Sequence, residues 1–359
     1  FSFGLSIFFL LTIIVGGSGT IVGPIIGTLL LVIIPEYLHF LDKYRLTIYG
    51  ALLIVSVIGL PQGIAGAIRK KFPRLVNFLP PEDVSAHPIS HNTDNYATGN
   101  ILDMQNVTKR FGGLTAIDNF SMAIKSKTVH SLIGPNGAGK STLINIINGV
   151  YHPDEGKVTF REKDLIGYKP DRIALAGIGR TFQNVQVFRN LTVLENVMSG
   201  MHCRTRSGAI AAILRTPRQR AEEAEIRDFS MECLQFVGVT EDYDREATTL
   251  AYGHQRRIEI ARALATKPKL LLLDEPAAGL NAGEKQELIE LIQRIRDERG
   301  ISVMLIEHDT GLVMKVSERI SVLDHGVKIA EGPPKEIQAN PKVIEAYLGQ
   351  EGEEADLDD

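Results

Sequence analysis

The chain has 359 residues, of which 44% are hydrophobic and 23% are charged, and its formal net charge is −4. This length predicts about two domains, and the composition is that of a folded protein rather than a disordered one. The slightly acidic balance excludes an overall basic surface for a nucleic acid. The two cysteines, Cys203 and Cys233, have no metal-binding or redox spacing, which favours free thiols in a reducing cytoplasm.

Residues 1–71 differ from the rest of the chain in charge. No charged residue precedes Glu36, and the stretch 46–68 is also uncharged. Apolar runs of this length favour membrane segments over a buried soluble helix, and they lack the basic start of a signal peptide. We expect two or three apolar segments, the first of which is either shortened or re-enters the membrane at a glycine-rich break. Gly23 and Gly27 are spaced to let two helices approach closely.

Four basic residues between positions 69 and 74 follow the last apolar segment. Because basic residues mark the cytoplasmic side of a membrane span, they predict that the rest of the chain lies in the cytoplasm. A solvated basic linker without topological meaning is the alternative. Residues 72–99 contain several prolines and polar residues without helical or strand periodicity, so we expect a flexible linker. The acidic stretch 351–359 is expected to be a disordered tail.

A strand, a glycine-rich turn and an amphipathic helix are predicted in turn from VHSLIGPNGAGKSTLINIING. Gly134, Gly139, Lys140 and Ser141 have the spacing of a loop that binds nucleotide phosphates. Glycines let backbone N–H groups approach phosphate oxygens, and the helix adds the positive end of its dipole. We expect Lys140 to reach the β- and γ-phosphates and Ser141 to bind Mg²⁺. The nucleotide-binding candidates here are Asn136, Gly137, Ala138, Gly139, Lys140, Ser141 and Thr142.

Two further apolar runs are predicted to be buried strands of a parallel sheet. The run KPKLLLLDEP ends in Asp274 and Glu275, and the run ISVMLIEHD ends at His308. Ligands bind at the carboxyl ends of strands in such sheets. We therefore expect Asp274 to hold Mg²⁺, Glu275 to polarise the attacking water and His308 to sense the γ-phosphate. A surface acidic pair and a structural histidine are the alternatives.

Two more candidates lie outside these runs. Gln183 follows another strand-like segment, and its amide can contact both a metal-bound water and a moving loop. It is therefore a candidate catalytic residue and a candidate metal ligand. Phe111 precedes the phosphate strand, where its ring can stack on adenine or pack in the core.

The order of these motifs resembles that of an ATP-binding cassette (ABC) subunit over residues 100–350. More narrowly, five segments resemble the ATP-binding subunit of branched-chain amino acid importers: GIGRTFQN, LTVLENV, YGHQRRIEIARAL, DEPAAGLN and IEHD. The apolar runs GGSGTIVGPIIG and YRLTIYGALLIVSVIGLPQG resemble the last spans of the matching permease. The resemblance implies a P-loop α/β cassette with a mixed sheet, an antiparallel β subdomain and a helical subdomain near 185–262. An all-α transmembrane permease fragment would precede it in the same chain.

The resemblance also implies an activity and partners. The activity is ATP hydrolysis, with ATP and Mg²⁺, that powers uptake of branched-chain or other hydrophobic amino acids. The implied partners are a second cassette packed head to tail, membrane permease subunits and an extracytoplasmic substrate-binding protein, without nucleic acid. The implied location is the cytoplasmic (inner) membrane, with the ATPase domain on its cytoplasmic side.

The stretch LAYGHQRRIEIARAL resembles the signature loop of these proteins, with Ala251 in place of serine. In a head-to-tail pair this loop caps the partner's ATP, and Ala251, Gly253 and Gln255 are its candidate contacts. The lost hydroxyl removes about 1–3 kcal/mol of hydrogen bonding, while Gly253 keeps an N–H and the helix expected to begin near His254 keeps its positive end. We therefore expect weaker closure and a competent ATPase. Asn281 replaces an aspartate at another cross-dimer position, which predicts a polar, uncharged contact.

Other functions share parts of this pattern. A urea or amide importer and a lipid exporter share most of the cassette, but the permease-like runs favour amino acid import. A soluble cassette ATPase of DNA repair would carry a long coiled coil between the phosphate loop and the signature, and no sustained heptad pattern occurs there. Soluble cassettes that act on ribosomes, and a membrane-anchored assembly factor that does not hydrolyse ATP, remain as further alternatives.

Overall fold

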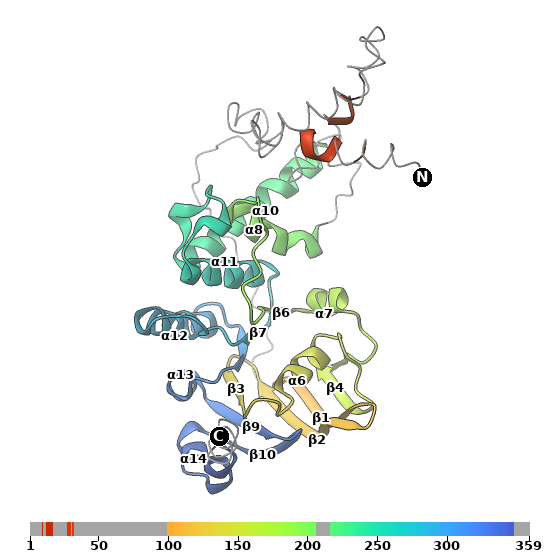
Figure 1. Ribbon diagram of the computed structural model, residues 1–359, viewed down its shortest axis with the longest axis vertical. Helices are drawn as coiled ribbons and strands as arrows, with labels where there is room; N and C mark the ends of the chain where they lie inside the picture. The colour runs from red at the N-terminus through yellow and green to blue at the C-terminus, as the bar shows by residue number, and fades with distance from the viewer. Residues whose placement is uncertain are drawn as a thin grey trace, which may run out of the picture. The chain divides into compact units, whose positions relative to one another are not determined.

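A computed structural model of the chain describes residues 99–205 and 216–347, together with residues 9, 12–16, 27–29 and 31. The chain divides into two units, Phe1–Ser85 and Ala86–Asp359, and the second unit holds every element labelled in Figure 1. Among the described residues, no helix combines the length and the apolar character needed to cross a membrane. Most of the predicted membrane segments and linker, and all of the acidic tail, lie outside the described residues.

In the first unit, Gly27 approaches another helical stretch closely. A Cβ atom at Gly27 would lie 2.0 Å from the carbonyl oxygen of Thr12 and 3.1 Å from the backbone nitrogen of Gly16. Such an approach requires a residue without a side chain, as the small-residue spacing predicted. Gly23, the other residue of that pair, lies outside the described residues.

The second unit begins with an antiparallel sheet, which has four strands within residues 99–205 in the order β2-β1-β4-β5. These strands are β1 (Asn100–Phe111), β2 (Leu114–Lys125), β4 (Glu155–Phe160) and β5 (Lys163–Asp164). β1 pairs with both β2 and β4, with a register shift between Met104 and Val107 in its pairing with β2. The apolar side chains of β1 and β2 form part of a core beneath this sheet.

The larger sheet has six strands over the described residues, in the order β10-β9-β3-β8-β7-β6. They are β3 (Val129–Ile133), β6 (Ile178–Arg180), β7 (Leu270–Asp274), β8 (Ser302–Ile306), β9 (Arg319–Asp324) and β10 (Val327–Gly332). The strands from β9 to β6 are parallel, and β10 is antiparallel to β9, so the sheet is mixed as predicted. The three predicted apolar strands are confirmed as β3, β7 and β8, although β8 ends at Ile306, before His308.

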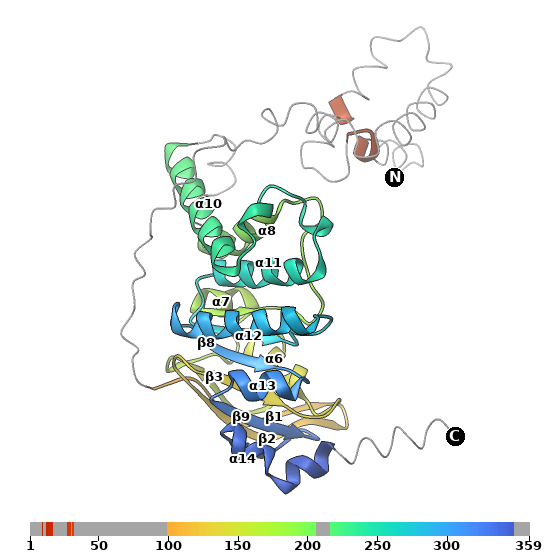
Figure 2. The ribbon, with the colours of Figure 1, turned by 90° about the vertical axis from the view of Figure 1, so that its left-hand side faces the viewer.

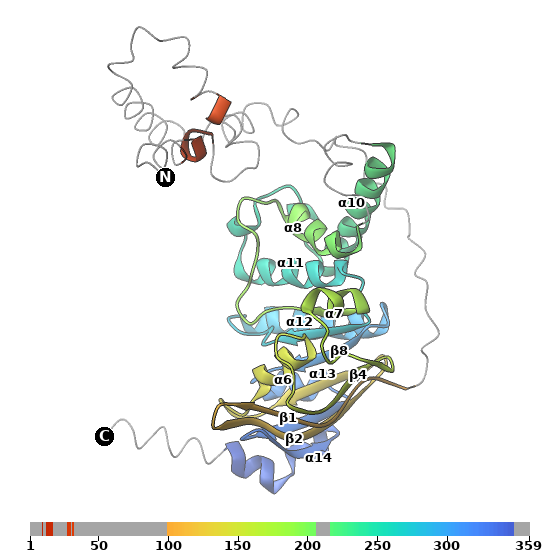
Figure 3. The same cartoon turned by 90° about the vertical axis from the view of Figure 1, so that its right-hand side faces the viewer.

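Helices flank the sheets and also form a separate layer. The flanking helices are α6 (Lys140–Ile147), α7 (Pro170–Ala176), α12 (Ala282–Asp297), α13 (Thr310–Val316) and α14 (Pro334–Gln338). The helical layer consists of α8 (Val193–Gly200), α10 (Pro217–Val237) and α11 (Tyr252–Ala265), with 3₁₀ turns at Met201–Arg204, Thr240–Asp242 and Ala247–Thr249. The three layer helices pack on one another, and Figures 2 and 3 show α7 and α12 between them and the antiparallel sheet.

Successive side chains of β7 enter two different hydrophobic cores. Leu271 and Leu273 join the core that includes the helical layer and α12, whereas Leu270 and Leu272 join the core beneath the antiparallel sheet. Adjacent side chains of a strand point to opposite faces, so a parallel strand covered on both faces is apolar throughout. This explains the uninterrupted leucine run, and it fixes the strand end that carries Asp274.

A buried histidine joins two strands of the larger sheet. Nε2 of His130, on β3, lies 2.9 Å from Oγ of Ser321, on β9. The pKa of His130 is lowered from 6.5 to about 4, mainly by burial; Glu331 opposes this shift, whereas Arg319 and Lys328 add to it. The folded state therefore holds a neutral imidazole at pH values where the unfolded chain binds a proton. Stability that is fully present above the unfolded pKa is lost as the pH falls through the folded pKa.

We predict that His130 alone lowers the free energy of unfolding by about 2 kcal/mol between pH 7.5 and pH 5. His130→Asn stays neutral at both pH values and should lose correspondingly less stability in urea unfolding. Buried acids with a raised pKa, such as Glu259, change stability in the opposite direction in both proteins, so the difference between the proteins is the quantity to compare. An equal pH dependence would contradict this assignment.

Candidate functional site

The carboxyl ends of three adjacent parallel strands bring the predicted catalytic side chains together. Gln183 follows β6, Glu275 follows β7 and His308 follows β8. Nε2 of Gln183 donates to Oε2 of Glu275 over 2.8 Å, and Nε2 of His308 lies 3.0 Å from Oε1 of the same carboxylate. The Glu275 carboxylate is half-buried, while the other two side chains are more exposed. Each oxygen of one carboxylate therefore has a partner from a neighbouring strand end.

The backbone of Glu275 has an uncommon conformation. Its φ is 48°, in the left-handed region that few residues other than glycine adopt. Its N–H donates to the carbonyl oxygen of Ile306, the last residue of β8, over 2.9 Å. Such conformations persist where the surrounding structure imposes them, and they cluster at active sites. Here the main chain of β8 is part of what holds Glu275 in place.

Asp274 is bonded to a basic residue that the sequence analysis did not single out. Arg180, on β6, donates from Nη2 to Oδ2 of Asp274 over 3.0 Å and from Nη1 to Oδ1 of Asn145, on α6, over 2.9 Å. Burial raises the pKa of Asp274, and the hydrogen bond from Arg180 opposes that rise. Arg180 thus favours the ionised carboxylate and links β7 to the helix after the phosphate loop. Its signal in the sequence is a basic residue shortly before Gln183.

Two glycines give the phosphate loop, residues 134–141, its close packing. A Cβ atom at Gly134 would lie 2.0 Å from the carbonyl oxygen of Leu323. Gly139 has a φ of 106°, and a Cβ atom there would lie 2.7 Å from the carbonyl oxygen of Ala116. Both positions therefore require glycine, because a side chain there would clash with the main chain of a neighbouring segment.

Lys140 folds back along this loop. It is 6% exposed, and its Nζ donates to the carbonyl oxygens of Gly134 and Pro135 over 2.6 and 2.7 Å. Burial lowers the pKa of Lys140, whereas Glu275 and Asp274 raise it. The phosphate loop follows β3, which pairs with β8, and Arg180 joins Asn145 of α6 to Asp274. The phosphate loop and the catalytic cluster therefore lie at the same edge of the sheet.

The other loop candidates differ in exposure. Asn136 and Gly137 are exposed and Ala138 is buried, whereas Ser141 is exposed and Thr142 half-buried in the first turn of α6. Because α6 begins at Lys140, the first-turn N–H groups face the loop. An exposed hydroxyl beside a helix N-terminus suits a phosphate or a cation bound to it.

Phe111, at the end of β1, is 41% exposed. Its ring packs edge-on against Tyr151, with 5.1 Å between the ring centroids, and Nζ of Lys109 lies 5.4 Å from its centroid. Stacking on a base requires an exposed ring with a fixed orientation. The geometry therefore favours the predicted adenine contact over a place in the core.

The signature segment forms the start of α11. This helix begins at Tyr252, so the prediction of a start near His254 was wrong by two positions. Ala251 is the N-cap residue and makes no side-chain hydrogen bond there, because a methyl group cannot accept one. The missing hydroxyl therefore affects the helix cap as well as any nucleotide contact.

Gly253 and Gln255 have partners within this segment and on α12. A Cβ atom at Gly253 would lie 2.4 Å from Oε1 of Glu284. Nε2 of Gln255 donates to the carbonyl oxygen of Leu250 over 2.8 Å, which stabilises the turn before the helix. Within the described part of the chain, no hydrogen bond joins Ala251, Gly253 or Gln255 to the Glu275 carboxylate.

Glu307 is a candidate that the sequence analysis missed. It is 4% exposed, and its Oε1 accepts from the N–H of Ala277 over 2.6 Å while its Oε2 accepts from the N–H of His308 over 3.0 Å. Burial raises the pKa of Glu307, and these backbone donors oppose the rise. Glu307 therefore joins the loop after Glu275 to the backbone of His308. Its signal was an acidic residue between an apolar strand and a histidine.

Asn281 caps α12. Its Oδ1 accepts from the N–H of Glu284 over 3.0 Å, and Oε2 of Glu284 accepts from the N–H of Asn281 over 2.9 Å. This reciprocal capping box fixes the start of the helix. One oxygen of Asn281 is therefore used within this chain, which leaves its amide NH₂ group for the predicted cross-dimer contact.

Comparisons of the sequence with known proteins match two parts of the chain to protein families. The family described as "ABC transporter" matches residues 117–278, and the family described as "Branched-chain amino acid ATP-binding cassette transporter" matches residues 327–353. The high-affinity branched-chain amino acid transport ATP-binding protein LivG of Salmonella typhimurium is 45% identical over 250 residues. That match covers 70% of this chain and 98% of LivG.

Solved structures share the fold. The crystal structure of the ADP conformation of MJ1267, an ATP-binding cassette of an ABC transporter, has a TM-score of 0.62 and 36% identity over 70% of this chain and 100% of that one. The dimeric structure of a post-hydrolysis state of the cassette MJ0796, bound to ADP and Pi, has a TM-score of 0.55 and 28% identity over 65% and 98%. The predicted cassette fold with its mixed sheet is confirmed by these similarities. This chain belongs to the ABC transporter family and contains its ATP-binding cassette.

Proposed function

We propose that this chain is the ATP-hydrolysing subunit of a membrane importer for branched-chain or other hydrophobic amino acids. The observation that carries the proposal is the Glu275 carboxylate, held between Gln183 and His308 beside the phosphate loop. The similarity to LivG, a branched-chain amino acid transport ATP-binding protein, supports the choice of substrate class.

Glu275 orients the water that attacks the γ-phosphate and accepts its proton. Phosphoryl transfer is catalysed mainly by positioning and by electrostatic stabilisation, so a base with a fixed position is the main requirement. Gln183 and His308 supply that position through their hydrogen bonds to the carboxylate. With nucleotide bound, Gln183 contacts the attacking water and His308 contacts the γ-phosphate. Lys140 neutralises charge on the β- and γ-phosphates.

The residues of the site also fit Mg²⁺. Ser141, Asp274 and Gln183 offer oxygen atoms, the ligand type that this cation prefers. Across residues 99–205 and 216–347, no group of three His, Cys, Asp or Glu side chains could hold a metal ion alone. Phosphate oxygens and water would therefore complete the shell. The cation would neutralise charge on the phosphates, and Asp274 would hold it while accepting the hydrogen bond from Arg180.

The proposed assembly has two cassettes packed head to tail, so that Ala251, Gly253 and Gln255 of each face the nucleotide of the other. The dimeric cassette bound to ADP and Pi supports such pairing. Permease subunits and an extracytoplasmic substrate-binding protein complete the importer, with the cassette on the cytoplasmic side of the inner membrane. The absence of charge before Glu36 supports a permease fragment within residues 1–71 of the same chain.

Glu275→Gln should abolish most ATP turnover without preventing nucleotide binding. Loss of a general base lowers kcat by about 10²–10⁴-fold, while the phosphate loop is unchanged. Turnover and MgATP binding are to be measured in the assembled complex. Glu287→Gln, which changes a carboxylate on α12 outside the site, is the matched control. Equal turnover of Glu275→Gln and the wild type would contradict the catalytic assignment, and a wild type without measurable turnover would favour a non-hydrolysing assembly factor.

Ala251→Ser should stabilise the chain and promote closure of the cassette pair. A serine at this N-cap position adds a hydroxyl acceptor for the N–H groups of the first turn of α11, which contributes about 1 kcal/mol. The same hydroxyl can bond to the partner's γ-phosphate. Urea unfolding measures the first effect, and the MgATP concentration at half-maximal turnover measures the second. Ala251→Val provides no hydroxyl and is no better an N-cap than alanine, so it is the control; a serine variant identical to it in both measurements contradicts the prediction.

The substrate class is tested by stimulation of ATP turnover. In vesicles that contain the purified partners, leucine, isoleucine or valine should raise turnover above the basal rate, because substrate-dependent closure couples the permease to the cassettes. Urea and phospholipid are the comparison compounds. Stimulation by urea or by lipid alone would assign the chain to one of the related ABC systems.

A further inference from the structure

We propose that Arg256 and Glu259 of α11 form a positioning pair, which fixes the main chain of Gln183 and Glu275 to the helical layer. The inference rests on the proposed function, because it concerns how the ATPase site is kept in order. Both residues follow the signature loop on α11, and neither was a candidate from the sequence. Their side chains are each 1% exposed.

Arg256 holds the main chain of two catalytic segments. Its Nη1 donates to the carbonyl oxygen of Phe182 over 2.7 Å, and its Nη2 donates to that of Gln183 over 2.7 Å. Nη2 also lies 3.3 Å from the carbonyl oxygen of Glu275. One guanidinium group thus spans the segments after β6 and β7, whose side chains meet at the Glu275 carboxylate.

Glu259 adds a hydrogen bond to the main chain of Phe182 and also pairs with Arg256. Its Oε2 accepts from Nη1 of Arg256 over 2.9 Å, and its Oε1 accepts from the N–H of Phe182 over 3.1 Å. The pair therefore bonds both the N–H and the carbonyl group of Phe182. This orients the peptide bond that leads into Gln183, whose own side chain reaches Glu275.

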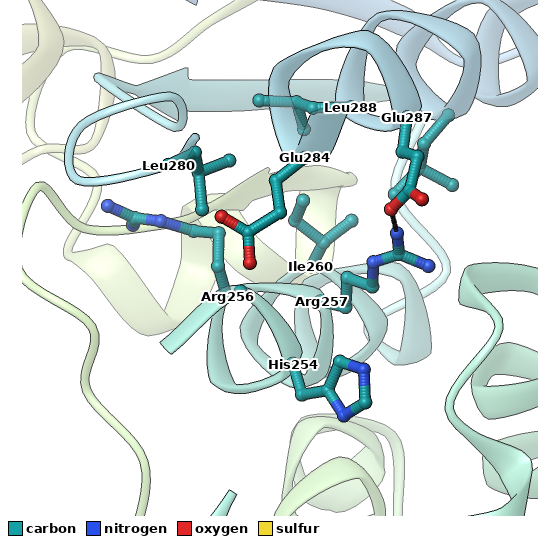
Figure 4. A pocket seen from close by; sticks show the side chains of 10 residues that line it. His254, Arg256, Arg257, Ile260, Leu280, Glu284, Glu287 and Leu288 are labelled. Atoms are coloured by element: carbon teal, nitrogen blue, oxygen red, sulfur yellow. Dashed lines mark hydrogen bonds and ion pairs between the residues drawn. The ribbon is translucent and has the colours of Figure 1, made fainter. Parts of the chain in front are cut away.

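Adjacent arginines of α11 have different roles. Figure 4 shows Arg257 reaching Glu287 on α12, while Arg256 extends the other way, toward Leu280. Arg257 also donates to the carbonyl oxygen of Val237 in the helical layer. Arg257 therefore joins helices to one another, whereas Arg256 joins α11 to the catalytic segments.

The connection is stiff because it is buried and charged. Ile258, Ile260 and Leu264 of α11 belong to the core shared with α8 and α10, so α11 is anchored in the helical layer. Separation of Arg256 from its acceptors would leave a buried charge without partners, which is strongly unfavourable. A displacement of the helical layer is therefore transmitted to the main chain at Gln183, and with it to the bond that orients Glu275.

If the pair only stabilised the fold, its replacement would change the melting temperature and leave the kcat of the folded protein unchanged. A buried ion pair replaced by apolar side chains of similar size often leaves stability unchanged, so the double variant Arg256→Met with Glu259→Leu removes both charges of the pair. Arg262, whose Nη2 lies 3.9 Å from Oε1 of Glu259, loses that longer contact, and its effect on folding is read from the melting temperature. The matched control is Arg299→Met with Glu232→Leu. That ion pair, with 2.5 Å between Nη1 and Oε1, joins α10 to the segment that follows α12.

The test uses the assembled transporter in vesicles and compares wild type, both double variants and Glu275→Gln. We expect Arg256→Met/Glu259→Leu to lower kcat about tenfold or more, since small misplacement of reacting groups has effects of this size. The KM for MgATP should stay within about threefold, because the phosphate loop is untouched. The melting temperature should stay within about 4 °C of the wild type, and the control pair should keep its kcat.

The outcomes distinguish failure of the positioning pair from failure of the proposed function. An unchanged kcat in Arg256→Met/Glu259→Leu overturns the positioning pair, and so does a kcat that falls only in proportion to lost folded protein or bound nucleotide. An equal fall of kcat in the control pair also overturns it, because the effect would then not be specific to Arg256 and Glu259. A wild type no more active than Glu275→Gln shows instead that the proposed function has failed.

Discussion

The parallel alignment of β6, β7 and β8 is the constraint on which the rest of the site depends. Because neighbouring parallel strands end at the same edge of a sheet, an amide, a carboxylate and an imidazole meet without a long loop. Their relative positions follow from the backbone hydrogen bonds that join β7 to β6 and to β8. A site built on such elements is held more closely than one built on mobile loops.

Buried charged side chains connect the strands at this edge of the sheet to one another and to nearby helices. Arg180 joins β6 to β7 and α6, Arg256 joins α11 to the segments after β6 and β7, and Glu307 joins two backbone segments after β7 and β8. A buried charge must be paired or hydrogen-bonded, so each of these groups restricts the main chain that it contacts. These buried groups thus fix the main chain that carries the catalytic side chains, and α6 and α11 take part through Arg180 and Arg256.

The sequence predicts this site where its chemistry is local. The phosphate loop is a compact pattern of glycines and one lysine, and the run of leucines before Asp274 indicates a strand covered on both sides. The partnership of Arg180 with Asp274 spans 94 positions, and that of Arg256 with Gln183 spans 73, so no local period reveals either. The start of α11 was misplaced for a different reason, since Ala251 lacks the polar side chain that usually marks an N-cap.

The position of Lys140 bears on how a nucleotide enters the loop. Its ammonium group has already left bulk water, and two main-chain oxygens stand in for the lost hydration. An arriving triphosphate therefore meets a cation whose desolvation and ordering were completed when the protein folded, which lowers the cost of association. When a nucleotide binds, the Lys140 ammonium group therefore exchanges main-chain oxygen acceptors for phosphate oxygens.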